Sequence, residues 1–221
     1  MTFQEARLDL TRRHRLGMVE AVWGEHKSAD QIVAILRSMQ SAGELALVTR
    51  VDAIKSAAVV NLCPAVQVHE QAACLTLGEI PATRQATQVA VLSGGTSDRR
   101  VAEEASLALS VHGVASKSFL DVGVAGLHRL LDVLPELTSM SVLITCAGME
   151  GALPTVLAGL VPQPVIGVPV SVGYGVSAGG RAALDGMLAS CAPGLSVVNI
   201  DNGYGAAMAA LRILKGVASQ D

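Results

Sequence analysis

The sequence contains very few aromatic residues, with one Trp, two Tyr and two Phe among 221 residues. Its core must therefore be built from Ala, Val, Leu and Gly, a composition typical of helices packed closely against a parallel sheet. Positive charge is not in excess either, because 16 Lys and Arg stand against 19 Asp and Glu, for a formal net charge of -3. This balance gives no electrostatic reason to expect nucleic acid or an anionic membrane as a partner.

Long hydrophobic runs are also missing, because Gly, Pro, Ser or Thr interrupts each run before about 18 residues, the length that spans a bilayer. The segment MTFQEARLDLTRRHR at the start is charged and has no apolar stretch typical of a signal peptide. The four cysteines, at 63, 74, 146 and 191, lack the paired spacing of a zinc site, and a chain of this length does not need disulfides. We therefore expect a cytoplasmic protein with reduced thiols and no membrane partner.

The first 85 residues (1–85) have an irregular pattern, which we interpret as a small α+β domain. Ser28 and Gln31 have the spacing of a capping box and precede a periodic apolar run that reaches Met39, which predicts a helix. Short aliphatic runs at 45–48 and 57–60, bounded by polar residues, are typical of strands, and a further run at 66–77 has a weaker periodicity.

From residue 88 the pattern becomes regular, and we assign residues 86–221 to an α/β domain. Apolar strands are predicted at 89–92, 142–146, 164–170 and 195–200, and each is followed by a glycine-rich turn and a helix. The first three of these helices are predicted to end near residues 112, 161 and 190. Such a pattern indicates a parallel sheet covered on both faces. Ligands bind at the carboxyl ends of the strands in such sheets, and every glycine-rich segment lies there.

The turn SGGTSD after the first of these strands suits a phosphate, because it combines two glycines, three hydroxyls and a following helix N-terminus. Its residues are Ser93, Gly94, Gly95, Thr96, Ser97 and Asp98. The alternative is a simple helix cap by Ser97 or Asp98. The turn matches neither a Walker loop nor GxGxxG, which disfavours a nucleoside triphosphate site.

The other turns carry further candidates. Glu150, in AGMEGALP, is a candidate base or metal ligand, or simply an acidic residue favoured at a helix start. The glycines of SVGYGVSAGG suit a loop that folds over a ligand or over a neighbouring subunit, and Tyr174 can stack on a planar ring. Asp201 and Asn202 suit a turn and helix cap. By spacing alone, Cys191 is best interpreted as an inert core thiol.

A segment of mixed polarity, DVGVAGLHRLL, places His128 near Asp121 and Arg129 in the sequence. Its simplest interpretation is a histidine on the surface of a helix.

Taken together, SGGTSD, AGMEGALP, PVIGVPV and NIDNGYGAAMAAL resemble the core of the aminoimidazole ribonucleotide carboxylases of purine synthesis (PurE), over residues 88 to 215. The longer motifs DVGVAGLHRLL, GMEGALP, SVGYG, SCAPG and LDLTRRHRLGMVEAVWG resemble the LarB family over nearly the whole chain. LarB proteins make the pyridinium biscarboxylic acid mononucleotide precursor of the nickel-pincer cofactor of lactate racemase. Ala152 stands where the purine enzymes have the histidine of AGxxAHLPG, which favours LarB. Ser28, Val170 and Tyr204 are mild departures from the LarB pattern.

The resemblance implies a PurE-like, flavodoxin-like, three-layer fold and a homo-octamer. It also implies carboxylation of the pyridinium ring of nicotinic acid adenine dinucleotide by carbon dioxide or bicarbonate, followed by hydrolysis that releases AMP. Cys191 would add covalently to the ring. Glu150 and Asp98 would hold Mg²⁺ or Mn²⁺, and His128, Asp121 or Glu150 would remove the ring proton.

The remaining turn residues would then bind the dinucleotide. Those expected to do so are Ser93, Gly94, Gly95, Thr96, Ser97, Asp121, Arg129, Gly148, Met149, Gly173, Tyr174, Gly175, Ser177, Asp201 and Asn202. Two other functions stay open at this point, an aminoimidazole ribonucleotide carboxylase or mutase and a non-catalytic nucleotide-binding assembly protein.

Overall fold

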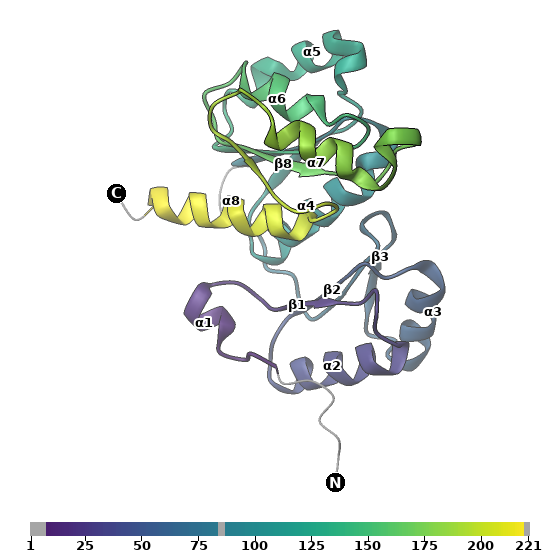
Figure 1. Cartoon of the computed structure of the whole chain (residues 1–221). Helices are drawn as coiled ribbons and strands as arrows, with labels where there is room; N and C mark the ends of the chain where they lie inside the picture. Colours follow the sequence, from purple (N-terminus) through teal and green to yellow (C-terminus); the bar gives the residue numbers. More distant parts are fainter. Residues whose placement is uncertain (1–7, 84–86, 219–221) are drawn as a thin grey trace. The chain divides into compact units, whose positions relative to one another are not determined.

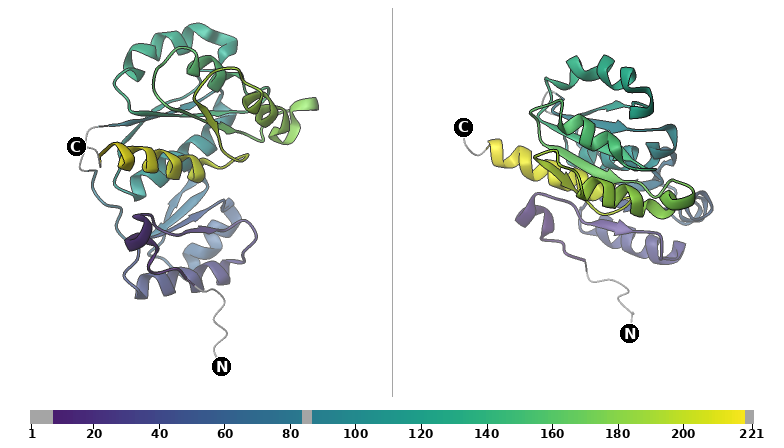
Figure 2. Two further views of the ribbon diagram at one scale, coloured as in Figure 1. Left: turned by 60° about the vertical axis from the view of Figure 1, so that its left-hand side comes forward. Right: turned by 45° about the horizontal axis from the view of Figure 1, so that its top comes forward.

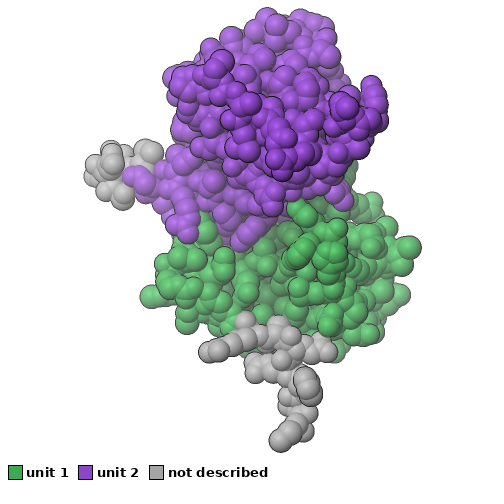
Figure 3. Space-filling model, viewed as in Figure 1, with its two compact units in different colours: residues 1–82 green, residues 83–221 purple. Residues whose placement is uncertain are grey.

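The computed structural model describes residues 8–83 and 87–218 (Figure 1). The chain divides into two compact units, residues 1–82 and 83–221, which Figure 3 shows in different colours. Each unit has its own cluster of buried apolar side chains. Within the described residues, no helix combines the length and the apolar character needed to cross a membrane.

The first unit is a four-stranded sheet in the order β1-β2-β4-β3. Its strands are β1 (Ala21–Trp23), β2 (Ala46–Thr49), β3 (Gln67–His69) and β4 (Cys74–Leu77). Its helices are α1 (Arg12–Leu16), α2 (Ala29–Ser41) and α3 (Ala53–Leu62), and a 3-10 turn, η1 (Glu70–Ala72), joins β3 to β4. β1 pairs with β2 in parallel, whereas β4 pairs antiparallel with both β2 and β3.

Side-chain caps decide where the helices of this unit begin. Ser28 and Gln31 form the predicted capping box, in which the Ser28 hydroxyl accepts the Gln31 amide at 3.1 Å and the Gln31 side chain accepts the Ser28 amide at 3.0 Å. The strand predicted at 57–60 is wrong, because this run lies inside α3. Asp52 caps α3 by accepting the Lys55 amide at 2.7 Å, and the helix then continues through the aliphatic run.

The second unit is a parallel five-stranded sheet in the order β6-β5-β7-β8-β9. Its strands are β5 (Val89–Ser93), β6 (Ser116–Phe119), β7 (Val142–Ala147), β8 (Val165–Pro169) and β9 (Leu195–Val197). Its helices are α4 (Arg99–Val111), α5 (Leu127–Leu137), α6 (Ala152–Ala158), α7 (Arg181–Leu188) and α8 (Gly203–Ala218), with 3-10 turns η2 (Thr96–Asp98), η3 (Val124–Gly126) and η4 (Gly175–Gly180). This strand order is the flavodoxin-like one, which confirms the expected fold.

Helices cover both faces of this sheet and make three layers. α4 and α8 pack together on one face, and α5, α6 and α7 cover the other (Figures 1 and 2). The sequence pattern missed β6 and made the helices after β7 and β8 too long, because these end at Ala158 and Leu188. β6 was missed because its sequence, SKSF, is polar and its first three residues are not buried.

Candidate active site

A cavity of about 430 Å³ lies at the carboxyl edge of the second sheet. The loops that follow β5, β6, β7 and β8 form its walls, as the position of the glycine-rich turns predicts. Its lining residues are Gly94, Gly95, Ser97, Asp98, Gly123, Val124, Ala125, Ala147, Gly148, Met149, Glu150, Ala152, Leu153, Val172, Gly173 and Tyr174.

Gly123 and Gly148 allow the main chains of neighbouring loops to come into close contact. A Cβ atom on Gly123 would lie 2.4 Å from the carbonyl oxygen of Gly94, and one on Gly148 would lie 2.3 Å from that of Val172. Both distances are shorter than any real contact, so a side chain at either position would force the loops apart. The shape of the cavity therefore depends on glycine at these two positions.

Asp98 joins two of the loops. Its Oδ2 accepts the amide of Gly95 at 2.8 Å, and its Oδ1 accepts the amide of Gly148, after the neighbouring strand β7, at 3.1 Å. The side chain is buried, and this burial raises the pKa of Asp98 above its usual value. The two amide hydrogen bonds act in the opposite direction, whereas the charge of Asp201 raises this pKa further.

Two more side chains make similar bonds around the same edge. Ser93 Oγ, which is fully buried at the end of β5, accepts the amide of Asp121 after β6 at 3.1 Å. Asp201 Oδ1, after β9, accepts the amide of Ser171 after β8 at 2.8 Å. We call these bonds, made by Ser93, Asp98 and Asp201, the rim ties. Each of these three side chains bonds to an amide in the loop after a neighbouring strand, which holds successive parts of the edge together.

The backbone at this edge also adopts unusual conformations. Asp121, Met149 and Asp201, each in a loop that follows a strand, have φ angles of 58°, 52° and 55°. Residues other than glycine adopt this left-handed conformation at an energetic cost, and such residues gather at functional sites.

The SGGTSD turn does not offer all of its main-chain amides to a phosphate. The amide of Gly94 donates to the Cys146 carbonyl at 2.9 Å, the amide of Gly95 donates to Asp98, and the amide of Asp98 donates to the Gly95 carbonyl. These three amides are therefore occupied within the protein. Ser97 lines the cavity, and within the described residues no Lys or Arg does.

Glu150 and Asp98, the two carboxylates expected to hold a metal, do not together form a cation-binding site. Glu150 lines the cavity and is exposed, but both oxygens of Asp98 already accept main-chain amides. In the part of the chain that the structure describes, no group of three or more His, Cys, Asp and Glu side chains is placed to bind a metal. These residues do not fit the expected Mg²⁺ or Mn²⁺ site, since such ions need several oxygen ligands.

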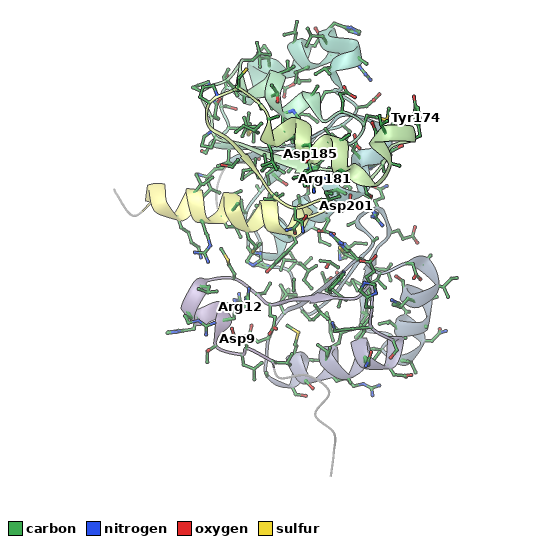
Figure 4. All side chains as sticks on the ribbon, viewed as in Figure 1. Asp9, Arg12, Tyr174, Arg181, Asp185 and Asp201 are labelled. Carbon is green, nitrogen blue, oxygen red and sulfur yellow. The ribbon has the colours of Figure 1, made fainter. Side chains whose placement is uncertain are left out.

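The other predicted residues divide between the cavity and its surroundings. Tyr174 lines the cavity and is 78% exposed (Figure 4). Arg129 forms an ion pair with Asp121 at 2.7 Å, and His128 is exposed at the start of α5, but none of the three lines the cavity. The remaining residues outside the lining are Ser93, Thr96, Gly175, Ser177, Asp201 and Asn202.

Cys191 is exposed and lies between α7 and β9. The interpretation as an inert core thiol is therefore wrong. In a parallel sheet the chain enters each strand at the amino edge, so Cys191, four residues before Leu195, lies at the edge opposite the cavity. Leu195 pairs with Val165 at one end of β8, and the Asp201 amide donates to the Pro169 carbonyl at the other end, four residues or about 13 Å further along. Cys191 is not among the residues that line the cavity of its own chain.

Two family models match the chain, the LarB/PurE-like N-terminal domain over residues 1–79 and AIR carboxylase over residues 88–220. An uncharacterized protein of Methanocaldococcus jannaschii is 37% identical over 222 residues, which cover 96% of this chain and 85% of that protein. The chain belongs to the LarB family. The N5-carboxyaminoimidazole ribonucleotide mutase of the same organism is 36% identical over 133 residues, 57% of this chain and 78% of the mutase. The LarB family, with its PurE-like core, indicates a carboxylase-related role.

Sequence reasoning missed the contribution of the loop after β6, where Gly123, Val124 and Ala125 line the cavity. These residues belong to the DVGVAG part of a LarB-like motif, whose small and apolar side chains carry no signal of a site. Because β6 was not predicted, the loop that follows it could not be placed at the carboxyl edge.

Proposed function

We propose that this protein carboxylates the pyridinium ring of nicotinic acid adenine dinucleotide and hydrolyses its phosphoanhydride. The products are pyridinium-3,5-biscarboxylic acid mononucleotide and AMP, and the mononucleotide would serve nickel-pincer cofactor synthesis and lactate racemase maturation. One observation carries the choice between the LarB reaction and the purine reaction. Ala152 lines the cavity where the purine enzymes carry their histidine, and within the described residues the lining contains no histidine. The purine reaction would lack its acid.

The proposed chemistry starts from an electron-poor ring that cannot itself attack carbon dioxide. The thiolate of Cys191 adds to the ring carbon beside the one to be carboxylated, and the ring becomes a dihydropyridine. Its enamine carbon then forms a bond to carbon dioxide. A base removes the proton from that carbon, the C–S bond breaks, and the thiolate leaves with its electron pair as the ring becomes aromatic again. No oxidant or reductant is consumed.

The geometry of the cavity favours particular residues for these roles. Of the three candidate bases, Glu150 lines the cavity, whereas His128 and Asp121 do not, so we assign removal of the ring proton to Glu150. Tyr174, on the loop after β8, would stack on the ring. Asp98 would act by holding the loops in place through its rim tie. We assign no step to a metal ion.

The position of Cys191 adds a requirement. Because the thiol is exposed at the amino edge, we propose that each cavity receives Cys191 from a neighbouring copy of the chain. This arrangement is compatible with the homo-octamer that the resemblance implies. A site shared between copies would leave an isolated chain inactive.

The first experiment measures the reaction itself. The purified protein is incubated with nicotinic acid adenine dinucleotide and ¹³C-bicarbonate, and the small molecules are analysed by mass spectrometry. We expect a mononucleotide carrying one added labelled carboxyl group, together with AMP. Cys191→Ser should give no labelled product while keeping its folded far-UV spectrum. Labelled product from Cys191→Ser would exclude the covalent step.

The second experiment tests whether the thiol is supplied by another copy. Ala125→Trp fills the cavity from an exposed position, and Cys191→Ser removes the thiol, so each variant alone should be inactive. If the two are dissociated and reassembled together, some sites combine an open cavity with an intact thiol, and activity should return. Continued inactivity of mixed assemblies, verified by native mass spectrometry, would place the thiol in its own chain's site.

A second candidate function is that of an aminoimidazole ribonucleotide carboxylase or mutase, favoured by the 36% identity to the archaeal mutase. The same protein is therefore also assayed with aminoimidazole ribonucleotides. Turnover of these compounds without any reaction of the dinucleotide would replace the proposed function with this one.

A further inference from the structure

The first unit contains a cavity of its own, of about 520 Å³, lined by α3, by β3 and by residues of the segment that joins β3 to β4. Its size falls within the range of small-molecule sites. It is formed entirely by the first unit and lies outside the carboxyl-edge cavity described above.

Residues with positive φ angles lie at this cavity, as they do in the loops around the carboxyl-edge cavity. Among the described residues, the non-glycine positions with positive φ outside the second sheet's loops are Arg50 and Ala73, at 57° and 49°. Ala73 lines the cavity, and Arg50 precedes Val51, another lining residue, whose amide donates to the Ala73 carbonyl at 2.8 Å. Local strain of this kind is retained where it shapes a site.

The walls of the cavity form an apolar slot. Ala53, Ala57 and Val60 share one face of α3, and Val68 of β3 lies across from them. Small side chains on the helix keep the slot open for a flat ring. Ser56, which is 7% exposed, also lines the slot and offers a hydroxyl to a ligand.

Polar groups stand at both ends of the slot. Asp52 caps the start of α3 and Asn61 lies near its end, nine residues later, which is about 13 Å along a helix. An Asn carboxamide can pair with the amine and ring nitrogen of adenine, and a carboxylate can accept the hydroxyls of a ribose. A nucleoside has about this length, with a base edge at one end and a diol at the other.

The charge of the lining argues against a phosphate inside the cavity. Asp52 and Glu70 are acidic, and Lys55, beside Asp52, donates to the carbonyl oxygens of Gly24 and Glu25 at 2.8 Å each. No Lys or Arg of the described chain lines the cavity. His69, the other titratable residue of the described lining, contacts Thr76 Oγ1 through Nε2 at 2.9 Å. The two carboxylates therefore favour a neutral ligand with several donors.

We propose that this cavity binds a purine nucleoside of the adenosine type. The base lies between the small residues of α3 and Val68, with its edge at Asn61. The ribose hydroxyls donate to Asp52 and Glu70. This site does not depend on the ring carboxylation proposed for the second unit, so either proposal can fail alone.

The test is isothermal titration of the full chain with adenosine. Ala57→Phe fills the slot from an exposed position on the helix, whereas Ile54→Phe, on the same helix but outside the lining, serves as the matched control. We expect the parent and Ile54→Phe to bind adenosine alike, and Ala57→Phe to bind at least about tenfold more weakly. Asn61→Leu and the ligand 2′,3′-dideoxyadenosine should each lower affinity about tenfold, because each removes hydrogen bonds.

Several results would overturn the proposal. These are no heat of binding with adenosine at millimolar concentration, binding that Ala57→Phe leaves unchanged, or tighter binding of AMP than of adenosine. Thermal unfolding of each variant, measured in the same buffer, shows whether a loss of binding comes from a loss of folding.

Discussion

Thr145 is a residue whose chemistry does not match its surroundings. It lies fully buried in β7, and its Oγ1 is one of the buried side-chain atoms without a hydrogen-bond partner in the described structure. A buried hydroxyl without a partner costs free energy. Thr145→Val keeps the shape and removes the hydroxyl, so we expect the free energy of unfolding to rise by about 1 kcal/mol. Urea unfolding measures this change, and a clear fall in stability would show that the hydroxyl has a partner.

Asp98 allows a prediction about pH. Burial raises its pKa above the usual 3.8, so the folded protein binds this proton more tightly than the unfolded chain does. The contribution of Asp98 to stability is therefore fully present below about pH 3.8 and decreases as the pH rises through the window above that value. Asp98→Asn has no such titration, and it also loses one of two amide acceptors, which costs about 1–3 kcal/mol.

We therefore expect Asp98→Asn to be less stable than the parent at pH 7, and the difference to be larger at acid pH. Denaturant unfolding of both proteins between pH 3 and 7 gives this difference directly, because other titrating groups cancel. A difference that increases with pH would reverse the assigned direction of the pKa shift.

At the scale of single residues, the sequence predicted the residue types that line the cavity. It was less accurate about which individual residues of those types lie there. Gly94, Asp98 and Tyr174 were expected at the site and line the cavity. Asp201 was also expected there, but its carboxylate accepts the Ser171 amide instead. Whether a polar side chain faces a ligand or the main chain of the next loop depends on contacts between loops, and one sequence does not contain that information.

At the scale of elements, the capping box of α2 makes a local prediction. Ser28→Ala removes the hydroxyl that accepts the Gln31 amide, and the loss of an N-cap typically costs about 1 kcal/mol. Ser38→Ala is the matched control, because Ser38 lies within α2 and its hydroxyl donates to the carbonyl of Ala34 in the preceding turn. We expect the midpoint of unfolding followed by circular dichroism to fall for Ser28→Ala and to stay nearly unchanged for Ser38→Ala.

The elements show where sequence patterns succeed. The strands β5, β7 and β8 were predicted because they are buried on both faces and therefore uniformly apolar. The polar edge strand β6 gave no such signal. The run at 57–60 was wrongly assigned to a strand, because its aliphatic residues suit either a strand or a helix. The N-cap at Asp52, upstream of this run, starts a helix that continues through it.

At the scale of the whole molecule, exposure divides the thiols into two classes. Cys191 is exposed, whereas Cys63, Cys74 and Cys146 are buried. Burial raises the pKa of the Cys146 thiol well above its usual range, and the nearby charges of Asp98, Glu104 and Asp201 add to this effect. We expect Ellman's reagent to modify one thiol quickly in the native protein and all four after denaturation.

The control for this titration is Cys191→Ser, which should lose the fast reaction and keep the other three thiols. Rapid reaction of two or more thiols in the native parent would contradict the burial of the remaining cysteines. Protection of the fast thiol by nicotinic acid adenine dinucleotide would support its position in a shared site.

The fold class of the second unit could be predicted, although β6 was missed, because its other strands and their turns repeat regularly along the chain. The position of Cys191 was not predicted, although a residue between a helix and the next parallel strand lies at the amino edge. The family resemblance assigned Cys191 a role in the site but gave it no position at the amino edge, and the proposed site shared between copies would reconcile the two.

The rim ties also limit how this protein can change during evolution. Each tie ends on a main-chain amide, which every residue except proline possesses, so Ser171 can be exchanged for most residues without loss of the bond. The accepting side chains, Ser93, Asp98 and Asp201, have no such freedom. Loop length is also fixed, because one inserted residue would move the amide away from its acceptor. Related sequences should therefore vary in the composition of these loops far more than in their length.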